Sequence, residues 1–215
     1  LKHIGAAFGD AAIGMVLLTI FVTTCAFAQF ESTLSLLTEA LGESDQDNFL
    51  IFAYVGFILT LSQGFIVRRL STKLEPKMLA LGGTAVMIVG LLLIGFAGKN
   101  GSVTQLFIVL PIAVIGFSAV TPSLQALLSL RTAAEKQGEI LGLGQSMSAL
   151  ARIAGPVIGM RMFDETHVEW PYWAGAAMMG VGLVLVALQR GAPSDDASKA
   201  DPNESVSGRV DSSAE

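Results

Sequence analysis

The stretch from residue 13 to residue 30, IGMVLLTIFVTTCAFAQF, contains no charged side chain and is mostly apolar. A helix needs about 20 such residues to cross the roughly 30 Å hydrocarbon core of a bilayer. The whole chain has the same character, with 52% hydrophobic residues, 14% charged residues and a mean hydropathy of +0.63. These values are typical of a membrane protein, so the stretch predicts a membrane-spanning helix that can continue past Glu31.

Five further apolar runs of similar length follow, and the charged residues cluster in the short connectors between them. The second run comes after Asp45 and Asp47, either of which can cap a helix start. The sequence therefore predicts an all-α membrane domain over residues 1–190 with six transmembrane helices. Their expected ranges are 11–40, 48–68, 77–97, 104–130, 138–162 and 171–189.

The last segment, residues 191–215, is rich in Ser, Asp, Ala and Gly and has almost no large apolar side chain. Such a composition cannot bury enough surface to offset the entropy of ordering, so we expect a disordered tail. The chain starts at Leu1 without a methionine, and we expect it to be a piece of a longer protein.

The distribution of lysine and arginine predicts how the helices are oriented, because cytoplasmic loops carry the excess of these residues. With the first helix starting inside, only Lys99 and Arg161 fall on the outer side. Both ends of the chain, including the tail, are then expected in the cytoplasm. The inner side holds Lys2, Arg68, Arg69, Lys73, Lys77, Arg131, Lys136, Arg190 and Lys199.

Several classes of function are disfavoured by the same composition. The net charge of −5 and the absence of a basic, aromatic face argue against a nucleic-acid partner. Cys25 is the single cysteine, and the only two histidines, His3 and His167, are far apart, so no metal site is expected. An intramembrane protease would need a nucleophile with a histidine base or paired carboxylates, and neither is present. We therefore predict that the protein is not an enzyme.

The fifth run, QGEILGLGQSMSALARIAGPVIG over residues 137–159, carries one arginine, Arg152, within an apolar helix. An arginine at the centre of a spanning helix costs about 2.5 to 3.5 kcal/mol, so it normally faces a bundle interior or a water-filled cavity. Pro156 has no amide hydrogen, so the carbonyl of Arg152 loses its helical partner and a kink is expected there. Small or polar residues share this helix face, which also fits a packing seam. They are Gln145, Ser148, Arg152, Gly155 and Gly159.

Glu31 is the candidate partner of Arg152. At 1.5 Å per residue, Arg152 lies about 18 Å from the inner boundary and Glu31 about 27 Å, close to the outer edge. Glu31 is then either an interfacial carboxylate or the partner of Arg152, and in the second case its protonation would release the arginine. Further polar candidates for a substrate or proton pathway are Gln29, Gln63, Gln125 and Gln145, with Phe27, Phe30 and Tyr54 as candidate aromatic lining.

Four segments together resemble the C-terminal half of major facilitator superfamily transporters, and most of all their bacterial drug-efflux and tetracycline-resistance-like branch. The resemblance spans residues 8–190 and implies helices seven to twelve of a twelve-helix fold, whose two halves flank a central substrate path. The segments are AQFESTL at 28–34, SQGFIVRRL at 62–70 with Lys73 and Lys77, GFS at 116–118 with Thr121-Pro122, and residues 137–159.

The basic loop after the second run resembles the second copy of the family's conserved cytoplasmic loop. Gly64, Arg69 and Lys73 fit that pattern, whereas Arg68 stands at the usual acidic position and Ser71 at the usual glycine. Two roles of this basic loop therefore stay open. It either forms a charge latch, as the family's loop does, or its positive charge simply fixes the topology.

The fifth run resembles the family's glycine-proline helix. Gly155-Pro156 and Gly159 match it, and Met160 departs from it. Pro122 in the fourth run is a further expected kink or packing position.

The resemblance implies a secondary transporter that exports a small organic solute by proton-coupled alternating access. It implies no cofactor beyond a proton gradient. The expected partners are the lipid bilayer, the solute and an N-terminal six-helix half, and the expected location is a bacterial inner membrane. Two alternatives stay open. The first is an uptake or metabolite transporter of the same superfamily. The second is a half-size membrane protein or scaffold that acts as a dimer.

Overall fold

The computed structural model describes residues 11–164 and 167–189, and within these ranges the chain is helical with no strand, as the sequence predicts. The expected tail at 191–215 lies outside the described residues. The elements are α2 (Ala11–Ala40), α3 (Asp45–Leu61), the π-helix η1 (Ser62–Val67), α4 (Arg68–Ser71), α5 (Pro76–Lys99), α6 (Val103–Leu130), the 3₁₀ turn η2 (Ala134–Lys136), α7 (Gln137–Met162) and α8 (Trp170–Leu188).

Local sequence signals set where several helices begin. The cap of α3 is Ser44 rather than Asp45 or Asp47, because the Ser44 hydroxyl accepts a hydrogen bond from the Asp47 amide at 3.3 Å. The Asp47 carboxylate accepts in return from the Ser44 amide at 3.2 Å, which completes a capping box. Helices α5 and α8 instead carry a proline in the first turn, where its missing amide hydrogen costs nothing.

The second expected helix, 48–68, is not one regular α-helix. It runs as α3, passes through the six-residue π-helix η1 and continues as α4 to Ser71. A π-helical turn bonds residues five apart and is a rare element that frequently occurs at functional sites. The Ser62 hydroxyl at its start lies 2.6 Å from the Ser118 hydroxyl of α6. Apolar periodicity alone did not indicate this change of helix type.

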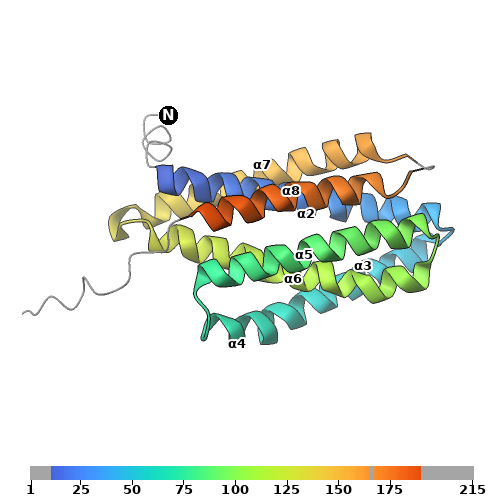
Figure 1. Cartoon of the computed structure of the whole chain (residues 1–215), viewed down its shortest axis with the longest axis horizontal. Coiled ribbons are helices and arrows are strands. Elements are labelled where there is room, and N and C mark those ends of the chain that lie inside the picture. Colours follow the sequence, from blue (N-terminus) through green and yellow to red (C-terminus); the bar gives the residue numbers. More distant parts are fainter. Residues whose placement is uncertain (1–10, 165–166, 190–215) are drawn as a thin grey trace, which may run out of the picture.

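The long helices lie side by side (Figure 1), with α8 between α2 and α5. The most extensive contacts join α5 to α6 and α2 to α7. Helices α3 and α4 lie at one edge of the bundle, and α7 lies at the opposite edge (Figure 1). The core is formed mainly by α2, α5, α6 and α8, with fully buried side chains such as Leu34, Leu91, Leu110 and Met179.

Within the described residues, five helical segments are long and apolar enough to cross a membrane: α2, the continuous stretch 45–71, α5, α6 and α8. Helix α7 is not among them, although its 26 residues make it about 39 Å long. Its polar residues, Arg152 and Gln145 among them, lower its hydropathy. Residues 11–164 and 167–189 thus contain six long helical segments, of which composition alone supports five as spans.

Candidate functional site: the charged face of α2 and α7

Glu31 of α2 and Arg152 of α7 lie next to each other, with 3.7 Å between the Arg152 Nη1 and Glu31 Oε2 atoms. The side chain of Glu31 is 46% exposed and that of Arg152 is 56% exposed. The two helices run in the same direction (Figure 1). Since α2 continues to Ala40 and α7 to Met162, both residues lie about 14 to 15 Å before their helix ends. The structure therefore places Glu31 at the same level as Arg152, within its helix rather than at its end.

Glycines of α7 explain why these two helices approach so closely. A methyl group added at Gly155 would lie 2.7 Å from the Cys25 carbonyl oxygen, and one at Gly159 would lie 2.8 Å from the Gln29 Cγ atom. Both glycines therefore pack directly against α2. This fits the interpretation of the small and polar face of α7 as a packing seam. A methyl group added at Gly138 or at Gly142 would have no neighbouring atom within 4 Å. Helix α7 is continuous through Pro156, and the expected bend there stays a prediction.

Polar residues continue this face toward the start of α7. Gln145 is exposed, and the half-buried Ser148 donates its hydroxyl hydrogen to the Gly144 carbonyl at 3.2 Å. Gln125 of α6 is also half-buried, and its Oε1 atom lies 3.6 Å from the position of a methyl group added at Gly144. Gln125 thus lies where α6 meets α7.

Gln29 occupies a different environment from Glu31, although both belong to α2. Its side chain is completely buried, and its Nε2 atom donates to the Pro171 carbonyl of α8 at 2.5 Å. The Gln29 Oε1 and Tyr172 hydroxyl oxygens are buried there without a hydrogen-bond partner. Gln29 is therefore part of the contact between α2 and α8, away from the exposed charge pair.

The aromatic candidates are mostly packing residues in this chain. Phe27 is buried and stacks on Phe117 of α6, with 3.6 Å between the ring centroids. Phe30 is also buried and meets Tyr172 edge-on. Tyr54 of α3 is half-buried and lies against Phe107, with 5.6 Å between the ring centroids. The burial of the two phenylalanines does not support the substrate lining that the sequence suggested for them.

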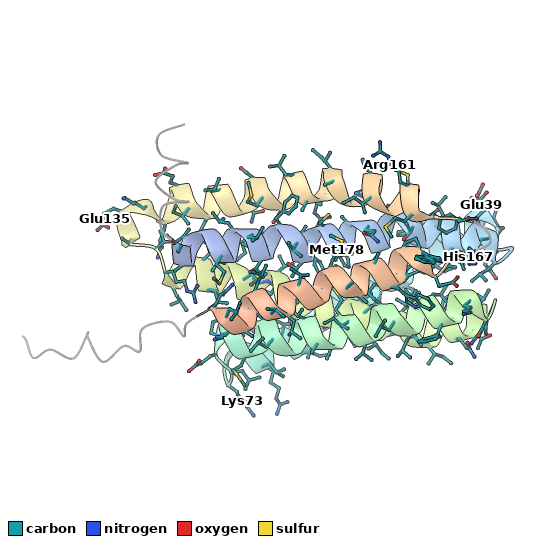
Figure 2. The ribbon with its side chains drawn as sticks, turned by 45° about the horizontal axis from the view of Figure 1, so that its top comes forward. Glu39, Lys73, Glu135, Arg161, His167 and Met178 are labelled. Atoms are coloured by element: carbon teal, nitrogen blue, oxygen red, sulfur yellow. The ribbon has the colours of Figure 1, made fainter. Side chains whose placement is uncertain are left out.

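The basic loop lies at the end of α3 and α4, with Gly64 in η1 and with Arg68, Arg69 and Lys73 all exposed. Figure 2 shows Lys73 and Glu135 toward one end of the molecule and Glu39 and His167 toward the other. This separation fits the predicted alternation of connectors. Pro122 is within α6 and exposed, and Gln63 in η1 is exposed as well.

Sequence reasoning missed several polar contacts that hold the helix ends together. The Lys77 Nζ atom donates to the Ala187 carbonyl at 3.1 Å and also to the Gln189 carbonyl, so a residue at the start of α5 caps the end of α8. Gln189 in turn donates to the Thr19 hydroxyl at 3.1 Å. No local signal marks a lysine that caps a distant helix. In the ranges 11–164 and 167–189, no cluster of three or more His, Cys, Asp or Glu side chains could hold a metal ion.

Comparison of the sequence with known proteins shows which family the chain belongs to. The Major Facilitator Superfamily matches residues 16–211 of the chain. The chain is similar to the tetracycline resistance protein, class G, of Vibrio anguillarum, with 30% identity over 139 residues that cover 65% of this chain and 34% of that protein. It is also similar to the class C tetracycline resistance protein of Escherichia coli, with 29% identity over 66% of this chain and 35% of the relative.

A further relative is multidrug resistance protein 2 of Bacillus subtilis (strain 168), which is 26% identical over 78% of this chain and 41% of its own length. The chain thus spans only about a third of the two tetracycline resistance proteins that it matches. The family match over most of the chain, together with the bundle of long apolar helices, shows that this integral membrane protein belongs to the Major Facilitator Superfamily, a family of transporters and not of enzymes.

Proposed function

We propose that this chain is the C-terminal half of a secondary transporter that exports a small organic solute in exchange for protons by alternating access. The family match and the names of the tetracycline and multidrug resistance relatives support this assignment. The six long helices then correspond to helices seven to twelve, with both ends of the chain in the cytoplasm of a bacterial cell. The other half, six further helices, completes the substrate path.

The observation that carries the proposal is the ion pair between Glu31 and Arg152. Both side chains are about half exposed in this chain, although each lies within a long helix. Hydrocarbon does not accommodate such charges, so this face of α2 and α7 meets water or further polypeptide. A charged, water-accessible face inside a membrane protein is where substrate and ion pathways occur.

The pair also supplies a mechanism for proton coupling. A proton that binds the Glu31 carboxylate removes its negative charge and ends its attraction for the Arg152 guanidinium. Arg152 is then free to interact with another anionic group or with the solute, and the contact between α2 and α7 changes along its exposed edge. Proton binding thereby gives the two access states different energies, which is what coupling requires.

The test is Glu31→Gln in the full-length transporter, assayed as proton-driven export into inverted membrane vesicles. We expect pH-dependent export to fall at least about tenfold, which is about 1.4 kcal/mol of lost coupling. Glu39→Gln is the matched control, because Glu39 is an exposed glutamate near the end of the same helix. Unchanged coupling in Glu31→Gln would contradict the proposed role of the pair.

The direction of transport can be measured with the same material. Inverted vesicles accumulate an exported solute, whereas right-side-out vesicles accumulate an imported one. Accumulation only in right-side-out vesicles would replace the export assignment with the uptake alternative, within the same superfamily.

A further inference from the structure

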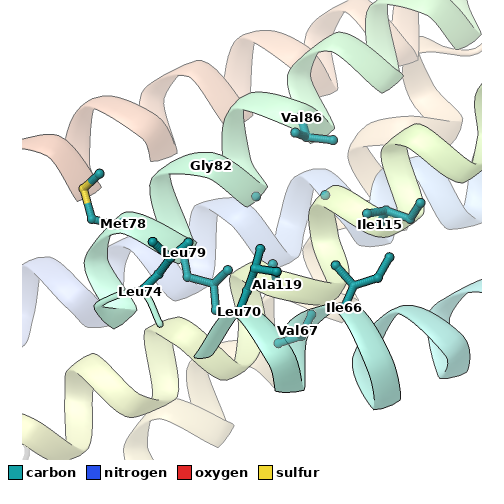
Figure 3. Close-up of a pocket in the computed structure, with 12 residues that line it drawn as sticks. Ile66, Val67, Leu70, Leu74, Met78, Leu79, Gly82, Val86, Ile115 and Ala119 are labelled. Atoms are coloured by element: carbon teal, nitrogen blue, oxygen red, sulfur yellow. The ribbon is translucent and has the colours of Figure 1, made fainter. Parts of the chain in front are cut away.

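An apolar groove lies on the edge of the bundle away from α7, between α4 and α5, with α6 at its base (Figure 3). It holds about 200 Å³ and is lined by apolar side chains and glycines. Leu70 and Leu74 form one wall, Met78 and Val86 form the other, and Gly82 lies between the last two. Leu74, Met78 and Val86 are each at least 40% exposed, so the groove opens to the surroundings of the protein.

The length of the groove matches one leaflet of a bilayer. Met78, Gly82 and Val86 are spaced four residues apart on one face of α5, so the groove follows this helix for about 12 Å. Half of the roughly 30 Å hydrocarbon core is about 15 Å. The groove thus begins beside the basic loop and extends into the apolar region over about the depth of a single leaflet.

The groove holds about 200 Å³ along about 12 Å of α5, so it is elongated along this helix. A single extended hydrocarbon chain can follow it along α5. An apolar groove open to a bilayer does not hold water stably, so a hydrocarbon chain is its natural occupant.

The segment that contributes Leu70 and Leu74 to the groove carries three basic residues and one acidic residue, Glu75. Arg68, Arg69 and Lys73 are exposed beside the lining residues Leu70 and Leu74. None of the three forms an ion pair with a carboxylate in the part of the chain that the structure describes. Basic clusters next to a membrane segment attract anionic lipid headgroups.

We propose that this groove binds one acyl chain of an anionic phospholipid, with the phosphate of the headgroup held by Arg69 and Lys73. The acyl chain occupies the space along Met78, Gly82 and Val86. The bound lipid joins α4 to α5, two elements that otherwise make few contacts. This site is independent of the charge pair on α2 and α7, which lies on the other side of the bundle.

The test is native mass spectrometry of the purified full-length protein with dioleoyl phosphatidylglycerol and, separately, dioleoyl phosphatidylcholine. The two lipids have the same acyl chains, so a difference between them reports the headgroup. We expect at least about fivefold more bound phosphatidylglycerol. The double substitution Arg69→Gln and Lys73→Gln should reduce that preference to less than about twofold.

A second variant tests the groove itself. Gly82→Leu fills the groove, and it does so without a clash at its Cβ atom because nothing lies within 4 Å of that position. Gly180→Leu is the matched control, since Gly180 is an equally open helical glycine in α8, outside the groove. We expect Gly82→Leu to lose the phosphatidylglycerol adduct and Gly180→Leu to keep it.

The melting temperature of each variant distinguishes the remaining outcomes. Phosphatidylglycerol should raise the melting temperature of the unmodified protein and of Gly180→Leu, but not that of Gly82→Leu. Equal binding of the two lipids, or an unchanged adduct in Gly82→Leu, would overturn the proposal. A lower melting temperature of Gly82→Leu with no change in bound lipid would also overturn it, because another protein segment would then fill the groove.

Discussion

Two helix pairs in this molecule, α5–α6 and α2–α7, approach each other through glycines but differ in how the glycines are distributed. In α5–α6, both helices contribute, because Gly83 faces the Gly116 carbonyl and a methyl group added at Gly90 would lie 2.5 Å from the Ala113 Cα atom. In α2–α7, the close approaches that the described residues show are made by Gly155 and Gly159 of α7. The first pair is flanked by apolar side chains, whereas the second carries the Glu31–Arg152 pair at its exposed edge.

The difference shows how one packing device serves two purposes. Lipid provides little hydrophobic drive for helices to associate, so close backbone approach and van der Waals contact hold them together. With glycines on both helices, α5 and α6 lock into one arrangement in the middle of the bundle. Helix α7 is held against α2 at Gly155 and Gly159 and keeps an exposed face with the Glu31–Arg152 pair, on which charges can change partners. We therefore infer that α5–α6 is the more rigid pair and α2–α7 the more adjustable one.

The largest expected effect is that of Gly90→Ala at the α5–α6 contact. The added methyl group would lie 2.5 Å from the Ala113 Cα atom, so one backbone must move. Such overpacking typically costs about 1 to 3 kcal/mol. For a protein of this size, each kcal/mol lowers the melting temperature by about 2 to 4 °C, measured in detergent.

Gly180→Ala is the control for this substitution, because Gly180 is a helical glycine of α8 outside the groove with nothing within 4 Å. It gains the higher helix propensity of alanine without a clash, so its melting temperature should stay level or rise. An equal fall in both variants would mean that α5–α6 is not the rigid pair.

A smaller effect is expected from Gly155→Ala at the α2–α7 contact. The added methyl group would lie 2.7 Å from the Cys25 carbonyl oxygen and 2.8 Å from the Ala28 Cβ atom. Because α7 lies at the edge of the bundle, it can move outward and relieve part of the strain. We expect a loss of about 1 kcal/mol, seen as a smaller fall in melting temperature than that of Gly90→Ala.

Gly142→Ala is the control for α7, since nothing lies within 4 Å of a methyl group at Gly142. The outward movement would also lengthen the 3.7 Å contact between Glu31 and Arg152, so proton-coupled export should weaken in Gly155→Ala and not in Gly142→Ala. A fall in melting temperature as large as that of Gly90→Ala would show that α7 cannot adjust.

The sequence predicted the all-helical fold because charges in the connectors and apolar runs between them are direct consequences of a membrane environment. It also singled out Glu31 and Arg152, since charges within apolar helices are rare. It could not predict which face of each apolar helix is buried, because lipid and protein core accept the same side chains. For that reason Phe27 and Phe30 were candidates for substrate contact, although both are packed in the core.

Features that depend on tertiary contacts were also beyond the sequence. Lys77 caps the distant end of α8, Gln29 contacts Pro171, and Ser62 at the start of η1 contacts Ser118 of α6. Each of these contacts joins segments far apart in the chain. Gly138 and Gly155 look alike in the sequence, yet only Gly155 packs against another helix. Small residues indicate that two helices can approach closely, but they do not show whether another helix lies beside them.

The smallest expected effect is that of Ser62→Ala at a third kind of contact, the hydroxyl pair between η1 and α6. Ser118 donates its hydroxyl hydrogen to the Ile115 carbonyl at 2.7 Å, so Ser62 is the donor in the 2.6 Å contact between the two hydroxyl groups. Such interhelical hydrogen bonds contribute about 0.6 kcal/mol on average, which predicts a fall in melting temperature of about 1 to 2 °C.

Two further variants decide whether this hydroxyl contact, and not the loss of any serine, causes the fall. Ser118→Ala should cost more than Ser62→Ala, because it leaves the buried Ser62 hydroxyl without the partner that it has in the structure. Ser146→Ala is the control, since the exposed Ser146 hydroxyl bonds only within α7, to the Gly142 carbonyl. If all three variants shift the melting temperature equally, the hydroxyl pair does not hold η1 to α6, and packing alone joins this edge to the more rigid α5–α6 pair.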